Sequence, residues 1–417
     1  MKTSLLRGLF ALALLSALSC DRLEGEIHIR RKDTMTHAEG GGRTPCGTDS
    51  TGTVDIPGDG LFLTAVDYPP GYDWRRDTAH GDIQGRVLLL RMREAGTAAF
   101  DTVLALVAGA GRAVSLDPDR HQFAGGHLYT HCLTEAGTVW RRDGKTVLLT
   151  QEREYLRGIL ALDGGIYTLS QRLSGTGFIL RRNWKPVLTR EEGSLHGSLG
   201  DPAFGRTGAL FEDSGQACFL YQDGNGQWIL VRDGQEQVVT LPSGIAKLYD
   251  IRCYESIIHL VCRVNKREPV LYVGSRKYDL SATLNAPAQK TGFHLLRAAD
   301  GVRISGTFRL NWNRQLCTGL WSEKQLLKTR KGRCDWLDGM AYVCREDGRV
   351  TEAGNGRENY TLEEGGTLMM PACACVSSEG LSLGMSGTSA GKPVLWMNGR
   401  SVPLGLNGFI SSVTVLE

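Results

Sequence analysis

A unit of about 41 residues recurs along this chain from about residue 85 onward. Each unit holds a glycine- or acid-marked turn, a strand, a second strand ending at a tight turn, and a short strand ending in Leu or Val. Asp-Gly and Asn-Gly pairs mark the tight turns, because both central residues of a type I′ turn need positive φ. A period of roughly 40 to 50 residues with about four strands per unit predicts a β-propeller, in which each unit is one radial blade. The tight-turn pairs lie in Arg142-Asp143-Gly144, Arg232-Asp233-Gly234 and Met397-Asn398-Gly399.

The copies of the unit can be aligned with one another. The segment 139–148 matches 395–404, and Gly111–Leu116 matches the second half of both. Counting the hairpins favours eight blades, with seven as the alternative if one hairpin is irregular. An extended β-solenoid and two stacked sandwiches are the alternative all-β arrangements. The turn that opens the unit recurs at 124–126, 162–164, 299–301, 337–339 and 378–380, with weaker copies at 213–215 and 254–256.

The end of the chain predicts how the ring closes. Phe409–Leu416 is a lone strand with no hairpin after it, whereas the first hairpin, from about Arg86, lacks an innermost strand. We therefore expect the last strand to complete the first blade, which removes the exposed edge of an open array. Leu61–Val66 competes for the same place.

The composition is consistent with one large all-β domain. Glycine accounts for 53 of 417 residues, roughly twice the usual ~7%, which suits many short strands and tight turns. No interior linker divides the chain, and a repeat fold can grow without splitting. We expect residues 59–417 to form a single propeller.

The N-terminus has the pattern of an export signal. Lys2 and Arg7 precede an apolar run over 8–18, which is shorter than the ~20 residues of a membrane-spanning helix. Residues 1–19 are therefore predicted to be a signal peptide. Ser19-Cys20 resembles the lipobox of bacterial lipoproteins, which implies lipid attachment at Cys20. Ordinary secretory cleavage is the alternative, since Ala17 and Ser19 also supply small residues.

Residues 20–58 differ from the repeats that follow. They carry Gly40-Gly41-Gly42 and few large apolar side chains, so they cannot bury enough surface to order themselves. We interpret this stretch as a tether, in which only Glu26–Ile29 alternates and could add a strand. The expected location is the bacterial cell envelope, with the lipid as the only membrane contact.

The repeats carry a family resemblance. An apolar-Trp-x-Asn/Asp-Gly hairpin, seen in Leu395–Gly399, has an aliphatic strand on either side. Over residues 85–417 it resembles the repeats of secreted and lipid-anchored bacterial β-propeller proteins, most of which have no assigned function. Eight blades on a lipoprotein also resemble the scaffold component of the outer-membrane protein assembly machinery. The Ala-x-Asp-x-x-Thr-Gly pattern of that family does not occur here, so this second resemblance concerns architecture alone.

The motifs that suggest catalysis or metal binding have simpler structural interpretations. Ser389 lies in a G-x-S-x-G pattern, but a nucleophile elbow joins a strand to a helix, and here strands are expected on both sides. His127, Tyr129 and His131 alternate on one strand face with His121 nearby, yet zinc needs three or four ligands. Packing or hydrogen-bonding roles are favoured for these histidines. No catalytic residue, metal or cofactor is predicted.

Two further patterns have structural interpretations. Asp223-Gly224-Asn225-Gly226 lacks the bidentate Glu of a calcium-binding EF-hand loop, so a hairpin turn is expected. The cysteines after Cys20 include no C-x-x-C pair, and most occupy interior strand positions, where Cys acts as a small apolar residue. We expect mostly reduced, buried thiols rather than disulfides. Ten cysteines are concerned: Cys46, Cys132, Cys218, Cys253, Cys262, Cys317, Cys334, Cys344, Cys373 and Cys375.

The balance of basic and acidic residues argues against two classes of partner but identifies none. The chain has 48 basic and 45 acidic residues without long runs of one sign, so neither nucleic acid nor an anionic membrane surface is expected. The favoured hypothesis is a non-catalytic envelope module that binds a protein or glycan through long connections such as Glu191–Thr207. One alternative is a glycan hydrolase or lyase with acidic residues at the central channel. The other is a scaffold subunit of an outer-membrane assembly or transport complex.

Overall fold

Short alternating segments separated by tight turns form antiparallel sheets in this chain. In the computed structural model every regular element of the described residues is a strand, and there are 33 strands. The described residues are 56–416 except for 58, 75–82, 94–98, 110–111, 113, 118–119, 164, 197–208, 265–268, 281–287, 299–300, 311–314, 324, 338–340, 347–348, 355–357, 362–368, 378–379, 388–391 and 398. The predicted signal peptide, Cys20 and nearly all of the predicted tether lie outside them.

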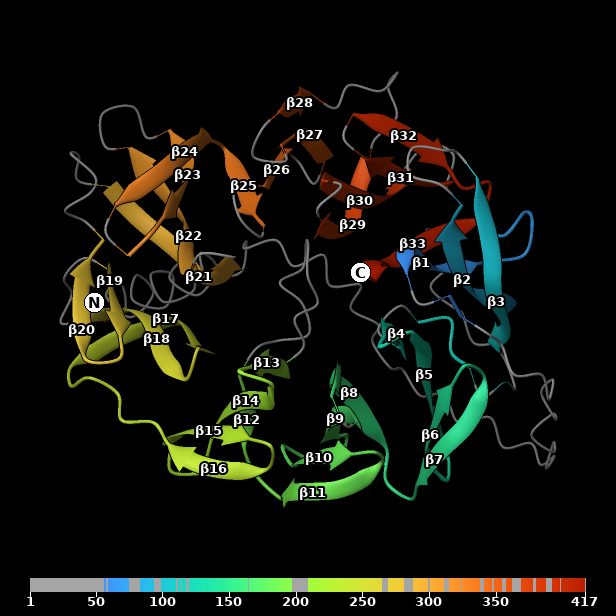
Figure 1. Ribbon diagram of the computed structural model, residues 1–417, viewed down its shortest axis with the longest axis horizontal. Helices are drawn as coiled ribbons and strands as arrows, with labels where there is room; N and C mark the ends of the chain where they lie inside the picture. The colour runs from blue at the N-terminus through green and yellow to red at the C-terminus, as the bar shows by residue number, and fades with distance from the viewer. Residues whose placement is uncertain are drawn as a thin grey trace, which may run out of the picture. The chain divides into compact units, whose positions relative to one another are not determined.

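The strands form eight sheets arranged in a ring, so the predicted eight-bladed β-propeller is confirmed (Figure 1). We number the sheets as blades 1–8 and give their strands from the centre of the ring outwards. Blade 1 contains β33 (Gly408–Leu416), β1 (Gly60–Asp67), β2 (Gln84–Met92) and β3 (Phe100–Gly109). Blade 2 contains β4 (His121–Ala124), β5 (His127–Thr134), β6 (Gly137–Arg142) and β7 (Lys145–Thr150). Blade 3 contains β8 (Glu154–Leu162), β9 (Gly165–Arg172), β10 (Phe178–Arg182) and β11 (Lys185–Arg190). Blade 4 contains β12 (Ser194–Leu195) and β13 (Phe211–Asp213), then β14 (Gln216–Gln222), β15 (Trp228–Arg232) and β16 (Gln235–Val238).

The other four blades follow the plain four-stranded pattern. Blade 5 contains β17 (Ile245–Tyr254), β18 (Ile257–Val264), β19 (Pro269–Val273) and β20 (Arg276–Asp279). Blade 6 contains β21 (Ala288–Ala298), β22 (Gly301–Leu310), β23 (Leu316–Trp321) and β24 (Leu326–Lys331). Blade 7 contains β25 (Arg333–Trp336), β26 (Tyr342–Glu346), β27 (Arg349–Gly354) and β28 (Asn359–Thr361). Blade 8 contains β29 (Met369–Ser377), β30 (Gly380–Gly387), β31 (Pro393–Met397) and β32 (Arg400–Pro403).

The C-terminal strand closes the ring, as predicted. β33 is the innermost strand of blade 1, with β1 beside it and antiparallel to it. The prediction that Leu61–Val66 competes with the last strand is wrong, because this segment lies in β1, between β33 and β2. Asn407 strengthens the join, since its Nδ2 donates to the carbonyl of Pro69 at 2.7 Å and to that of Tyr72 at 3.0 Å.

Hydrophobic side chains fill the interfaces between neighbouring blades. Phe62 of blade 1 contacts Phe123 of blade 2, with ring centroids 4.8 Å apart. Phe178 of blade 3 meets Phe219 of blade 4 edge to face at 5.5 Å. Each blade therefore buries its faces against its neighbours, which is why a single blade cannot form a core alone.

The turns that marked the repeat also tie the strands together. Asp143 and Asp233 adopt left-handed conformations with φ of 51° and 46°, and glycines with positive φ follow them. Asp143 donates its backbone N–H to the Leu128 carbonyl at 2.8 Å, and its Oδ1 accepts from the Leu128 N–H at 2.8 Å. Asn183 and Asp233 form the same pair of bonds in blades 3 and 4. An Asp or Asn is favoured here because it tolerates positive φ and supplies the acceptor.

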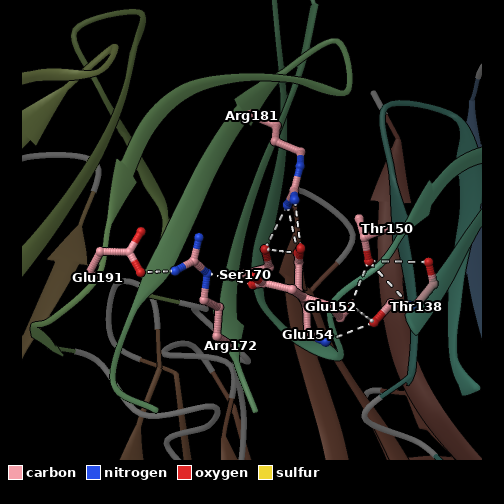
Figure 2. A network of polar contacts seen from close by, with 8 residues as sticks. All are labelled: Thr138, Thr150, Glu152, Glu154, Ser170, Arg172, Arg181 and Glu191. Atoms are coloured by element: carbon pink, nitrogen blue, oxygen red, sulfur yellow. Dashed lines mark hydrogen bonds and ion pairs between the residues drawn. The ribbon is translucent and has the colours of Figure 1, made fainter. Parts of the chain in front are cut away.

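A buried polar network joins blades 2 and 3 (Figure 2). The carboxylate of Glu154, at the start of β8, accepts from both Nη atoms of Arg181 at 2.7 Å and from Ser170 Oγ. Thr138 of blade 2 accepts from the Glu154 N–H at 2.7 Å and donates to the Glu152 carbonyl. Glu154 and Arg181 are almost fully buried, so each is stabilised only while its partner remains.

One disulfide lies in blade 7. Cys334 and Cys344 are register partners on β25 and β26, with an S–S distance of 2.05 Å. Residues directly opposite each other on antiparallel strands are close enough for such a bond, so the expectation of thiols is wrong for this pair. It holds for Cys218, Cys253 and Cys262, which are buried thiols like Cys317, while Cys132 is a half-buried thiol. The side chains of Cys46, Cys373 and Cys375 lie outside those described.

Candidate functional site

The histidines singled out in blade 2 do not converge on one point. His127 and His131 lie on β5, but their rings make different contacts. His127 Nδ1 lies 2.6 Å from Asp143 Oδ2 at the turn, whereas His131 Nε2 lies 3.1 Å from Arg120 Nη1 and its ring stacks on Trp140. His121 Nε2 is 2.6 Å from the carbonyl of Ser115. These contacts agree with the packing and hydrogen-bonding roles favoured from the sequence.

The other sequence motifs have the following outcomes. Asp223 forms a hairpin turn, as predicted, because its Oδ1 accepts from the N–H groups of Asn225 and Gln227 at 2.9 and 2.8 Å. Ser389 lies outside the described residues, although the elements on either side, β30 and β31, are both strands. Within the described ranges no group of three or more His, Cys, Asp or Glu side chains is arranged to hold a metal, and no helix is long and apolar enough to cross a membrane.

Blade 4 is where the ring departs from its repeat. In each of the other seven sheets a single strand occupies the innermost position, but in blade 4 two short strands, β12 and β13, both pair with β14. β12 ends at Leu195 and β13 begins at Phe211. The long connection expected over Glu191–Thr207 therefore interrupts the innermost strand, and residues 197–208 lie outside the described part.

His196 lies at the point where β12 ends. Its backbone N–H donates to the Leu220 carbonyl at 2.9 Å, which fixes the residue beside β14. Its Nε2 lies 3.1 Å from Oδ1 of Asp250 on β17 of blade 5. The His196 side chain is 23% exposed and that of Asp250 only 5%. The pair thus joins blade 4 to blade 5 and leaves part of the imidazole at the surface.

Asp250 is held by donors from three blades. Besides His196, its carboxylate accepts from the N–H groups of Ile251 and of Leu295 in blade 6, both at 2.8 Å. Burial disfavours the charged form, but hydrogen bonds from His196 and Leu295 and the charge of Arg252 outweigh it and hold the pKa of Asp250 below its ordinary value. The carboxylate therefore stays ionised and orients the His196 ring.

An aromatic side chain completes this surface. The indole of Trp228, at the start of β15, meets the His196 ring edge to face with centroids 5.1 Å apart. Trp228 is half-buried, so it presents part of an aromatic surface next to the exposed part of the imidazole. We call His196, Trp228 and Asp250 the blade 4 site.

The chemistry available at the blade 4 site is recognition through hydrogen bonding and stacking. The second ring nitrogen of His196 can exchange a hydrogen bond with a ligand, and an indole surface suits the apolar face of a sugar or a partner side chain. Among the described residues, no hydroxyl or thiol nucleophile is hydrogen-bonded to the imidazole of His196.

A second buried carboxylate joins blades 4 and 5 without forming a site. Asp213 Oδ2 accepts from Arg232 at 3.1 Å and from the Ser256 N–H at 3.0 Å. The Cys253 thiol lies 3.3 Å from the same oxygen. Burial raises the pKa of Cys253 to about 12, which keeps it an unreactive thiol.

Sequence reasoning identified the long connection but missed His196, Trp228 and Asp250. His196 follows a two-residue strand, and Asp250 sits in a strand with two register shifts, so neither shows a regular pattern. The only available signal was the length of the connection before β13.

Comparisons with known proteins place this chain in no family. No known family profile matches it, and no curated protein matches it. Solved structures with related arrangements include the dihydro-heme d1 dehydrogenase NirN, with 11% identity and a TM-score of 0.47 over 88% of this chain and 78% of that one. Apo AztD from Citrobacter koseri has 9% identity and a TM-score of 0.41 over 86% and 99% of the two chains. A quinoprotein alcohol dehydrogenase-like protein from Bacteroides thetaiotaomicron has 9% identity and a TM-score of 0.31 over 80% and 85%. We infer no activity from these similarities.

Proposed function

We propose that this chain is an exported, lipid-anchored β-propeller that binds a protein or glycan partner at the blade 4 site and does not catalyse a reaction. The observation that carries the proposal is the interruption of the innermost strand at one point of the ring. In repeat folds a departure from the repeat is a common place for binding residues, because the rest of the ring holds it rigidly. His196, oriented by Asp250, and Trp228 supply the contacting groups.

The proposed compartment rests on the predicted N-terminal signal, and the disulfide supports it. A signal peptide over 1–19 would direct the chain out of the cytoplasm, and lipid on Cys20 would retain it at a membrane. The Cys334–Cys344 disulfide in blade 7 is typical of an oxidising environment. The Cys20→Ser variant should move from the membrane fraction to the soluble fraction and lose incorporation of labelled fatty acid.

Binding can be tested on the purified chain with a polysaccharide array and, in parallel, a pull-down from envelope extract. We expect a partner whose binding Trp228→Ala and His196→Ala weaken at least tenfold. Leu149→Ala, on the outer strand β7 of blade 2, is the control, because Leu149 is 63% exposed and blade 3 separates it from blade 4.

Two outcomes would contradict the proposal. Equal binding of every partner by the wild type and by both blade 4 variants would show that no partner binds at the blade 4 site. Cleavage of a bound glycan, detected as new reducing or unsaturated ends, would replace the binding role with an enzymatic one.

A further inference from the structure

Two neighbouring hairpin turns carry the same basic pattern. The β6–β7 turn reads Arg-Arg-Asp-Gly-Lys over 141–145, and the β10–β11 turn reads Arg-Arg-Asn-Trp-Lys over 181–185. Figure 1 shows blades 2 and 3 side by side. We call the exposed cations of these turns, together with Trp184, the turn patch: Arg142, Lys145, Arg182, Lys185 and Trp184.

The four cations of the turn patch form no ion pair within the described part of the chain. Arg142 lies beside the phenol of Tyr129, and the guanidinium of Arg182 lies over the Tyr167 ring, 5.5 Å from its centroid. The described ion pairs include neither of these arginines, nor Lys145 or Lys185. The carboxylate of Asp143, in the same turn as Arg142, is directed to the Leu128 N–H and to His127. Exposed cations gathered without ion pairs form a positive potential that attracts an anion.

Aromatic contacts bring the two turns to one place. The Trp184 ring, from blade 3, lies 5.8 Å from the Tyr129 ring and 6.4 Å from the Trp140 ring, both of blade 2. Arg142 also contacts Tyr129 of this aromatic cluster, whereas Arg182 lies over Tyr167, whose phenol is next to Asp233 of blade 4. Trp184 is half-buried, so part of its ring remains available to a ligand.

The backbone at Trp184 is unusual for its residue type. Its φ is 68°, and the corresponding turn positions hold Gly144, Gly234 and Gly399 with φ between 82° and 87°. A bulky residue in the left-handed region costs about 1–3 kcal/mol relative to relaxed backbone. Glycine would avoid that cost, so the indole itself has a use at this position.

A polar group with a fixed orientation borders the cluster. His127 is 42% exposed, and its ring lies 6.2 Å from the Tyr129 ring. Asp143 holds Nδ1, so Nε2 is left for a hydrogen bond to a ligand. Cations, an aromatic surface and a polar ring nitrogen are the groups that recognise an acidic sugar.

We propose that the turn patch binds an acidic polysaccharide, whose carboxylates pair with the four cations and whose sugar ring stacks on Trp184. A membrane surface fits less well, because the Trp184 ring lies against Tyr129 and Trp140 rather than standing free for insertion. The turn patch lies at the opposite end of the strands from the blade 4 site, so the two proposals are independent.

The test measures binding of the full chain to polygalacturonate, with neutral dextran for comparison, by titration calorimetry. We expect polygalacturonate to bind and dextran to give no binding signal. The affinity for polygalacturonate should fall steeply as the salt concentration rises. The variant R142S/K145S/R182S/K185S should bind at least tenfold more weakly. The matched control R276S/K277S removes two exposed cations from the β19–β20 turn of blade 5 and should bind as the wild type does.

Trp184→Gly separates binding from folding. Glycine relieves the backbone at this position, so the melting temperature should change little, while the affinity for polygalacturonate should fall about tenfold. His196→Ala and Trp228→Ala should leave this affinity unchanged, which distinguishes the turn patch from the blade 4 site.

Three results would overturn the inference. The first is equal affinity of the wild type and the fourfold variant for polygalacturonate. The second is an equal loss of that affinity in the blade 5 control. The third is binding to phosphatidylglycerol vesicles without binding to polygalacturonate. The last result would identify the turn patch as a membrane-contacting surface.

Discussion

Individual buried side chains determine how this propeller responds to pH. Burial, together with the positive charge of Arg120 and the neighbouring His121, holds the pKa of His131 well below its ordinary value. Burial also lowers the pKa of His259 in blade 5. Both imidazoles therefore stay neutral in the folded chain at pH values where an unfolded chain would protonate them.

The sign of the effect on stability follows from this difference. Below a pKa of about 6.5, His131 binds a proton in the unfolded chain but stays neutral in the folded chain. The free energy of unfolding therefore falls as pH falls. The slope is up to about 1.4 kcal/mol per pH unit for each such histidine. We expect His131→Gln to flatten the pH dependence between pH 6.5 and 5, measured by urea unfolding. His294→Gln, which replaces an exposed side chain, should leave the slope unchanged, and an unaltered slope in His131→Gln would contradict the assignment.

At the residue level the sequence predicted which side chains share a strand but not which partners they meet. His127 and His131 alternate on one strand, as expected, yet their partners are Asp143 and Arg120. Arg120 precedes β4, and Asp143 follows β6. Such partners depend on register and loop path, which alternation alone does not specify.

Individual turns and strands were the most predictable part of the molecule. Asp-Gly pairs indicate a tight turn with positive φ at both residues, and the turns at 142–144 and 232–234 have this geometry. The break between β12 and β13 could not be predicted, because it arises from residues 196–210, which carry no strand periodicity. The Cys334–Cys344 pairing also required the register of β25 against β26.

The turn that links β6 to β7 yields a prediction for the blade. Asp143→Ala removes the acceptor of the Leu128 N–H and places Ala at a φ of 51°, so we expect a loss of about 1–3 kcal/mol in the free energy of unfolding. Asp143→Asn keeps an acceptor and tolerates the left-handed conformation, as Asn183 does in blade 3, and should cost less than half as much. Urea unfolding measures both variants. Asp163→Ala, at an exposed position in another turn, is the control. Equal losses of unfolding free energy in the Ala and Asn variants at 143 would show that the hydrogen bond from the Leu128 N–H to Asp143 does not stabilise the blade.

The ring as a whole depends on its last strand, β33, pairing with its first described strand, β1. Ile410 and Val413 of β33 are buried in the same hydrophobic cluster as Leu63 and Leu88 of blade 1. Burial of each such side chain contributes about 1.5–3 kcal/mol, and β33 also satisfies one edge of β1. Sequence reasoning predicted this closure because a terminal strand had no hairpin partner.

A chain that ends at Leu406 should therefore lose cooperative unfolding and its near-ultraviolet circular dichroism. A synthetic peptide of residues 407–417 should restore part of the signal, because it can refill the innermost position of blade 1. The milder variant Asn407→Ala removes only the bonds to Pro69 and Tyr72 and should cost about 1–3 kcal/mol. A truncated chain that melts at the wild-type temperature would show that blade 1 does not need β33.

The position of β1 also determines how the ring bears mechanical force. A pull on the residues before Gly60 acts along β1, which is bonded to β33 on one edge and to β2 on the other. Hydrogen bonds between antiparallel strands run perpendicular to the strands, so such a pull loads both ladders in shear, many bonds at once. A strand at the edge of a sheet would carry the same pull on one ladder alone. If the N-terminus is anchored to a membrane, the β1–β33 pairing that closes the ring also carries the tension between that anchor and a bound partner.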